Sequence, residues 1–295
     1  MYQKNFSKSS MQSTENSNFL IVDANGNSFG KILLYNNNMR MLLGYKDEEL
    51  KALTIESLMP QPIYQKHPLF IRRFNHTGQA FIINNKATMF VKKKNGFVAP
   101  TEMFIKFHHS IDYQYTFLAI MKPFYEMAPF ANGLRYTMDQ LMFMIVENDV
   151  EGCISEFSDS ANRILKGFGM KLNSEESNVT QRIVDILPDL DYVTLRSTRG
   201  DRILSKEIYE ADHAFDFSSF QESANPLHPH VNNAVLKSGS GVLLSGEVLA
   251  GVEIKQNRAR AKVRVFEERY SAGLLELNVI CIAFATREND GGASN

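Results

Sequence analysis

Short apolar runs separated by turn residues dominate the beginning of the chain. Residues 18–35 hold two such runs, one on either side of Asn25-Gly26. Asn-Gly accepts the positive φ angles of a tight hairpin turn. The pattern therefore predicts two antiparallel strands joined at this point.

Short helices are predicted after this hairpin. Apolar residues at helical spacing precede Gly44, which can supply a left-handed C-cap. Asp47 can begin a second helix, and Thr54 can cap a third that ends at Pro60.

A longer helix is predicted within residues 59–78. Its apolar residues share most of one helical face: Ile63, Phe70, Ile71 and Phe74. Pro68 perturbs its early part, and Gly78 can end it.

Three strand-like runs follow this helix. Asn95-Gly96 can close the hairpin between the first two. In the second run, Met103, Ile105 and Phe107 alternate with polar residues, as expected for a half-buried strand. The order of two strands, short helices and three strands predicts an α+β domain of roughly 110 residues, with the helices gathered on one side of an antiparallel sheet.

A second copy of this order is predicted in residues 137–286. It begins with an apolar run, a turn at Gly152 and another run, followed by a helix capped by Ser158 or Asp159. Its residues 182–188 repeat the pattern of residues 54–60, and both segments end in proline.

The later parts of the second copy differ from each other. Residues 190–240 lack a good counterpart in the first copy and indicate a long loop with marginal helices. Residues 242–286 supply the closing strands, in which charged residues alternate with apolar ones.

The resulting division has five parts. Residues 1–17 form a polar, disordered lead-in, and residues 18–123 form the first domain. Residues 124–136 form a linker, residues 137–286 the second domain, and residues 287–295 a disordered tail. The two polar ends are also compatible with a piece of a longer protein.

Composition narrows the function classes. With 44% hydrophobic residues among 295, the chain can bury a sizeable core. Its net charge of -1 gives no overall field for nucleic acid or an anionic membrane, and no apolar run is long enough to insert into a bilayer. Cys153 and Cys281 are the only cysteines, without metal-ligand spacing, and fit a reducing cytosol.

Recognised catalytic motifs are absent from the sequence. It contains no GxSxG, P-loop, HExxH or kinase catalytic loop. We therefore predict that the chain is not an enzyme.

The two domains resemble the PAS family of sensory and interaction domains. Residues 21–50, "IVDANGNSFGKILLYNNNMRMLLGYKDEEL", are similar to the family's opening hairpin and its Asn-led helix ending in Leu-Gly-Tyr. Residues 92–106, "KKKNGFVAPTEMFIK", are similar to its later hairpin. The resemblance covers residues 18–123 well and residues 137–286 weakly.

This resemblance implies a fold class and a role. Each PAS-like domain would be a five-stranded antiparallel sheet with short helices on one face, enclosing a pocket or a plug of side chains. The outer face, flanking helices and linkers would serve dimerisation and signal relay to a protein partner. The Asn-rich tandem arrangement also resembles cytosolic PAS segments of multi-pass membrane proteins in protists, which implies a cytoplasmic location within a larger protein.

Residues 59–78 are also similar to a segment of heme-PAS oxygen-sensing kinases. The matching positions are Met59, Pro60, His67, Arg73, Thr77 and Gly78. The resemblance implies that His67 would be the axial ligand of a heme iron and Arg73 a propionate partner, which requires a neutral imidazole facing a dry pocket.

A structural role for His67 is the alternative. The same spacing occurs in PAS domains without heme, where Met-Pro closes one helix and Thr-Gly the next. His67 would then cap or hydrogen-bond within the group of helices. Lys86 and Ala87 stand where the oxygen-sensing kinases place a distal Arg, so oxygen discrimination of their type is not expected.

Other candidate sites have simpler interpretations. Cys153 and Cys281 lack the neighbours of a flavin-photoreceptor cysteine. His108 and His109 are adjacent in a predicted strand and would point to opposite faces, which excludes a chelate. The cluster of Lys92, Lys93 and Lys94 indicates a solvated hairpin, and Phe104, Phe107 and Phe117 are predicted to be core.

A second group of histidines lies in the predicted loop of the second copy. His228 and His230 are close in sequence to Asp212 and His213. No further ligand is spaced to complete a tetrahedron, so surface histidines are favoured over a metal site.

Overall fold

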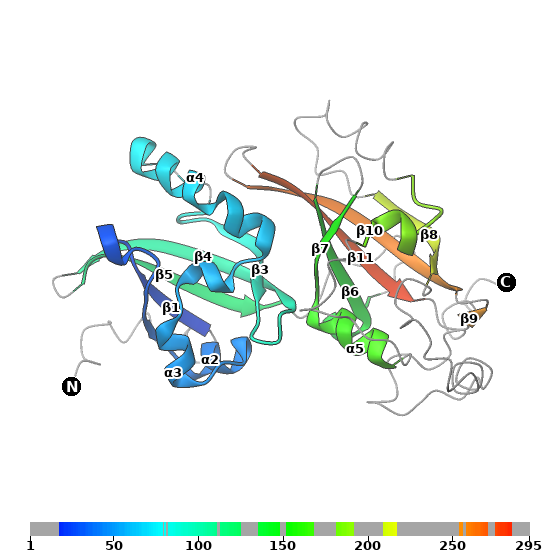
Figure 1. The fold of residues 1–295 in the computed structure, drawn as a ribbon, viewed down its shortest axis with the longest axis horizontal. Coiled ribbons are helices and arrows are strands. Elements are labelled where there is room, and N and C mark those ends of the chain that lie inside the picture. The colour runs from blue at the N-terminus through cyan, green and yellow to red at the C-terminus, as the bar shows by residue number, and fades with distance from the viewer. Residues whose placement is uncertain are drawn as a thin grey trace. The chain divides into compact units, whose positions relative to one another are not determined.

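The computed structural model describes residues 18–78, 80, 82–110, 113–124, 135–147, 152–167, 181–191, 209–216, 254–255, 258–270 and 275–284. These residues belong to two compact units, each built around one antiparallel sheet (Figure 1). The predicted lead-in 1–17, the tail 287–295, most of the linker 124–136, and His228 and His230 lie outside the described residues.

The first unit contains five strands in the order β2-β1-β5-β4-β3. Their bounds are β1 Asn18–Asp23, β2 Ile32–Tyr35, β3 Lys86–Lys92, β4 Val98–Ser110 and β5 Gln114–Pro123. Each neighbouring pair is antiparallel. The predicted hairpins and strands are therefore confirmed.

Short helices lie between β2 and β3. They are α2 (Asn37–Leu43), α3 (Asp47–Ala52), a 3-10 turn at Ile55–Leu58 and α4 (Gln61–Thr77). Gly44 ends α2 with φ 79° and Gly78 ends α4 with φ 65°, both in the left-handed region that glycine adopts without strain. The sequence had located both helix ends correctly.

The turn between β1 and β2 differs from the predicted tight turn at Asn25-Gly26. Asn25 is extended, with φ -97° and ψ 129°, and a 3-10 turn at Gly26–Ser28 follows it. The Asn25 side-chain amide donates to the carbonyl oxygens of Tyr113 and Tyr115 and to the carboxylate of Asp23, at 2.8, 3.0 and 2.6 Å. The two long-range bonds, to Tyr113 and Tyr115, hold Asn25 outside the left-handed conformation that a two-residue turn requires. We call this group of bonds the Asn25 latch.

Strand register assigns each residue of the first sheet to one of its two faces. The rings of Phe107 and Phe117 are opposed across β4 and β5 and meet Phe74 of α4, so this is the inner face, covered by helices. Phe104 and Ile120 are also opposed, and lie on the other, outer face.

The second unit repeats the topology of the first. Its strands are β6 (Leu141–Glu147), β7 (Ile154–Phe157), β8 (Tyr209–Asp216), β10 (Arg258–Tyr270) and β11 (Leu275–Phe284), in the order β7-β6-β11-β10-β8. The short β9 (Ile254–Lys255) pairs with the start of β10. When the five strands of each main path are counted along the chain, both sheets have the order second, first, fifth, fourth, third. The predicted α+β fold class, with a five-stranded antiparallel arrangement and helices in each unit, is confirmed.

Strand β8 corrects the prediction of a long loop in residues 190–240. Its residues Tyr209, Ala211, His213 and Phe215 alternate with polar or small residues. Ala211 and His213 are opposite Val263 and Ala261 of β10, and Phe215 is buried. The period-2 pattern of a strand was therefore present in the sequence, but it was short and lay in a segment without a counterpart in the first copy.

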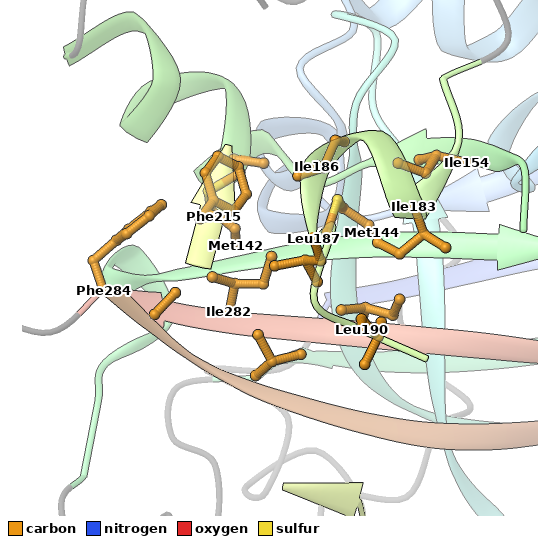
Figure 2. Close-up of a cluster of buried hydrophobic side chains, with 14 of the residues drawn as sticks. Met142, Met144, Ile154, Ile183, Ile186, Leu187, Leu190, Phe215, Ile282 and Phe284 are labelled. Carbon is orange, nitrogen blue, oxygen red and sulfur yellow. The ribbon is translucent and has the colours of Figure 1, made fainter. Parts of the chain in front are cut away.

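The second sheet carries an aliphatic core on the face covered by α5 (Asp159–Gly167) and α6 (Ile183–Ile186). Side chains from β6, α6, β8 and β11 meet there (Figure 2). Ser158 is the cap of α5, because its Oγ accepts a hydrogen bond from the Ala161 N–H at 3.1 Å. The same Oγ accepts the N–H of Phe143 at 3.0 Å, which ties the cap to β6.

The opposite face of this sheet is also removed from water. Its central residues are at most 2% exposed: Leu141, Phe143, Ile145, Val279, Cys281 and Ala283. Apolar residues on both faces explain the continuous hydrophobic run of β6. Within the described residues, no helix has the length and apolarity needed to span a bilayer.

Candidate functional site

His67 lies on the inner side of α4 and faces the 3-10 turn that precedes this helix. Its Nδ1 is 3.3 Å from Oε1 of Glu56, and its side chain is only 14% exposed. The interpretation that His67 hydrogen-bonds within the group of helices is therefore confirmed. The contact connects α4 with Ile55–Leu58 across Pro60.

The contact with His67 lowers the pKa of the Glu56 carboxyl group. Its pKa lies below the ordinary value of 4.5, chiefly because of the hydrogen bond with His67, while partial burial opposes the shift. Glu56 is therefore ionised at neutral pH and presents a charge to the imidazole.

Gly30 packs against the other side of Glu56. It has φ 84°, and a Cβ atom at this position would stand 2.9 Å from Oε2 of Glu56. The Gly30 carbonyl also accepts the N–H of Ile55 at 2.8 Å. The φ of 84° favours glycine, and a Cβ atom here would displace the Glu56 carboxylate, so the β1–β2 turn, Glu56 and His67 form one connected group.

Aromatic rings occupy the inner face beside His67. The ring centroid of Phe29 lies 6.5 Å from that of His67 and 6.1 Å from that of Phe117. Phe74 lies 5.8 Å from Phe107 and 5.9 Å from Phe117. These spacings are typical of aromatic pairs in contact, so the rings join α4 to β4, β5 and the β1–β2 turn.

The aromatic rings become more exposed toward the end of the β4–β5 hairpin. Phe107 is 37% exposed and stacks on Tyr115, which is 48% exposed, with ring centroids 5.5 Å apart. The prediction that Phe107 is core is therefore wrong, because it lies where the sheet runs past its helical cover. Phe104 is half-buried on the outer face rather than in the core between sheet and helices.

Arg73 lies on a different side of α4 from His67. Residues six apart on a helix are rotated by about 240°, so the two side chains diverge by about 120°. Arg73 is exposed, and its carbonyl accepts the hydroxyl of Thr77 at 2.8 Å. The two proposed heme residues thus share a helix but do not point to one place.

The positions that depart from the oxygen-sensing kinases lie at the start of β3. Lys86 forms an ion pair with Glu102 at 3.2 Å. Ala87 is opposite Met103 of β4 and therefore belongs to the inner face.

Metal and thiol chemistry finds little support in the described residues. They contain no group of three His, Cys, Asp or Glu side chains arranged to hold a metal ion. His108 and His109 are opposite Thr116 and Tyr115 in the sheet and point to opposite faces, as predicted. Cys281 is buried and Cys153 half-buried, and both are free thiols.

Glu56 was missed by sequence reasoning. It precedes His67 by eleven positions, and Pro60 and Pro62 lie between them, so no continuous helical or strand period relates the two. The only sequence signal was the prediction of two consecutive helices that meet at Pro60 and could bring their side chains together.

Comparison with solved structures returns PAS domains. A PAS domain from Desulfitobacterium hafniense is 18% identical and matches 39% of this chain and 99% of its own, with a TM-score of 0.31. The PAS domain of the fruit-fly ELK potassium channel is also 18% identical and matches 39% of this chain and 92% of its own, with a TM-score of 0.30. A light-oxygen-voltage domain studied with a flavin analogue is 16% identical and matches 39% of this chain and 82% of its own, with a TM-score of 0.31.

No protein-family model and no curated protein matches the sequence.

Proposed function

We propose that this chain is a non-catalytic regulatory module that relays a signal through contacts between proteins. It would act in the cytoplasm, as part of a larger signalling or membrane protein. Self-association through the outer face of the first sheet is the form of contact that we propose.

The observation that carries this proposal is an apolar row across the outer face of the first sheet. Phe19, Ile120 and Phe104 are aligned on β1, β5 and β4, and all three are half-buried. Ile21 and Leu118 form a second aligned pair beside them. A continuous apolar row on the side away from the helices is a surface that another protein chain can cover.

Light scattering over a range of protein concentrations tests this proposal. Wild-type protein should form dimers as its concentration rises, and Ile120→Glu should shift the midpoint of dimer formation upward by about tenfold or more. Tyr113→Glu, which places the same charge on an exposed side chain away from this row, is the matched control. A strictly monomeric wild-type protein at high concentration would count against self-association.

A second candidate function is binding of heme in the first unit. It is supported by the contact between His67 Nδ1 and Glu56, because metal-bound histidines commonly donate their other ring nitrogen to a carboxylate. His67 would hold the iron through Nε2, and the rings of Phe29 and Phe117 would supply an apolar surrounding. Arg73 points away from His67, so the propionate contact expected from the resemblance is not part of this proposal. Heme would supply gas-binding or redox chemistry to the module.

Absorption spectroscopy after addition of hemin tests this second candidate. A Soret band should appear in wild-type protein and should be lost or shifted in His67→Gln. His76→Gln removes an exposed histidine from the same helix and should leave the band unchanged. Equal spectra for wild type and His67→Gln would rule out His67 as the axial ligand.

A further inference from the structure

We propose that the exposed side of α4 binds an acidic, helical segment of a partner protein. This surface, which we call the basic face, consists of Lys66, Leu69, Arg72, Arg73 and His76. The proposal rests on the regulatory role above and specifies the chemistry of a partner at a second surface, separate from the outer face of the sheet.

Helical geometry places these side chains together. Lys66 precedes Leu69 by three residues, while Arg72 and Arg73 follow it by three and four. Residues at these spacings are neighbours on a helix surface. Leu69 is 41% exposed, so an apolar side chain lies at the centre of a group of cations.

The charge of α4 has one sign. Its sequence, "QPIYQKHPLFIRRFNHT", contains a lysine and two arginines but neither aspartate nor glutamate. Glu56, the carboxylate next to α4, is paired with His67 on the inner side of the helix. In the described part of the chain, no carboxylate lies within salt-bridge distance of Lys66 or Arg72.

The expected partner follows from charge complementarity. Carboxylates spaced three and four residues apart on a helix could meet Lys66, Arg72 and Arg73, while an apolar residue between them covers Leu69. Charged groups at such an interface mainly set specificity and association rate, so binding should weaken as salt is added.

An anionic membrane is a poorer fit for this surface. A helix that lies in a bilayer interface buries a wide apolar face in lipid. In α4 the apolar side chains belong to the inner face, where Ile63 is buried and Phe74 meets Phe107 and Phe117. The basic face offers Leu69 alone for insertion, which favours a protein partner.

Fluorescence anisotropy with the full 295-residue chain tests the proposal. The probe is a labelled helical peptide of about 16 residues with glutamates and leucines on one face. A second peptide of the same composition has these residues scattered around the helix. The chain should bind the first peptide at least about fivefold more tightly than the second, and raising salt from about 50 mM to about 300 mM should weaken binding.

Charge reversal locates the surface. Arg72→Glu with Arg73→Glu should weaken binding of the patterned peptide about tenfold. Leu69→Ala should weaken it about threefold. The matched control is Lys46→Glu with Lys166→Glu, which applies the same charge change to exposed lysines that belong neither to α4 nor to the outer face of the first sheet, and should have little effect. Circular dichroism confirms that each variant is folded.

Several outcomes would overturn the proposal. These are equal binding of the two peptides, equal loss in the Arg72/Arg73 and Lys46/Lys166 variants, and binding only to vesicles containing phosphatidylserine or only to single-stranded RNA. Light scattering separates this result from the proposed self-association, because the Arg72/Arg73 variant should still form dimers. Failure of one proposal would therefore be distinguishable from failure of the other.

Discussion

The two units share one strand order but fill their inner faces differently. In the first, the rings of Phe29, Phe74, Phe107 and Phe117 gather beside the polar side chain of His67. In the second, the core is largely aliphatic, and no member is more than 8% exposed. The same strand order therefore supports two kinds of inner face. That of the first unit contains a histidine and partly exposed aromatic rings, and that of the second unit is apolar and buried throughout.

This difference should affect how much stability each unit loses when an inner-face side chain is removed. A sealed aliphatic core has its largest effect on stability, because every side chain in it is removed from water. In the first unit, Phe107 leaves 37% of its surface exposed, so removing this ring should cost less stability.

The largest expected effect compares phenylalanines in the two units. Phe215→Ala should lower the free energy of unfolding of the second unit by about 3–5 kcal/mol, since the ring is fully buried. Phe107→Ala should cost the first unit about 1–2 kcal/mol, since its ring is 37% exposed. Urea denaturation followed by hydrogen exchange measures each unit separately. Equal losses would contradict the distinction between a sealed and an open inner face.

A smaller effect is expected from Gly30→Ala in the first unit. The new Cβ would strain a backbone with φ 84° and push the Glu56 carboxylate away from His67, for a total of about 1–3 kcal/mol. Gly78→Ala is the matched control, because it has φ 65° and no atom within 4 Å of the added Cβ. The difference in thermal midpoint between the two variants isolates the contact with Glu56. Identical midpoints would show that this contact does not constrain the turn.

The Glu56 carboxyl group should give the first unit a specific dependence on acid pH. Its pKa is lowered in the folded state, so the stabilisation is present above the ordinary value of 4.5 and is lost as pH falls through the folded-state pKa. Glu56→Gln should remove this part of the pH dependence, so the stability curves of variant and wild type should converge in acid. Thermal denaturation between pH 3 and pH 7 checks this, and parallel curves would contradict it.

The smallest effects are expected at surface ion pairs, in both units alike. Lys94 pairs with Glu49 in the first unit, and Lys262 pairs with Asp212 in the second, each at 2.8 Å. Lys94→Gln and Lys262→Gln should each change the melting temperature by no more than about 1 °C, because exposed pairs are screened by water and salt. A large change in melting temperature in only one unit would show that the two units also differ in their surface ion pairs.

Local chemistry explains which features could be predicted from the sequence. Gly44 and Gly78 end helices and Gly152 lies between β6 and β7, all with a positive φ. Glycine adopts this conformation without strain, so such helix ends and turns can be predicted from the residue and its immediate neighbours. The strands of the first unit could also be predicted, because they are short apolar or alternating runs separated by turn residues. The prediction of a tight turn at Asn25-Gly26 was wrong, because the Asn25 side-chain amide donates a hydrogen bond to Tyr115, 90 residues away in the chain.

The missed parts of the candidate site depend on tertiary contacts. The pairing of Glu56 with His67 requires a proline-separated turn and helix to fold back on each other, which no sequence period encodes. The exposure of Phe107 depends on how far the helices extend over the sheet, since its alternation is the same as that of a buried strand residue.

The Asn25 latch makes one end of the first sheet vulnerable to chemical ageing. In an Asn-Gly pair, the backbone nitrogen of the glycine can attack the side-chain amide and release ammonia, and water then opens the resulting cyclic imide to leave an acid in place of the amide. At Asn25 this would replace a donor to the Tyr113 and Tyr115 carbonyls with a negative charge facing them and the Asp23 carboxylate. Deamidation at Asn25, followed by peptide mapping during storage at alkaline pH, should therefore track loosening of the β4–β5 hairpin; unchanged hydrogen exchange in that hairpin would contradict this.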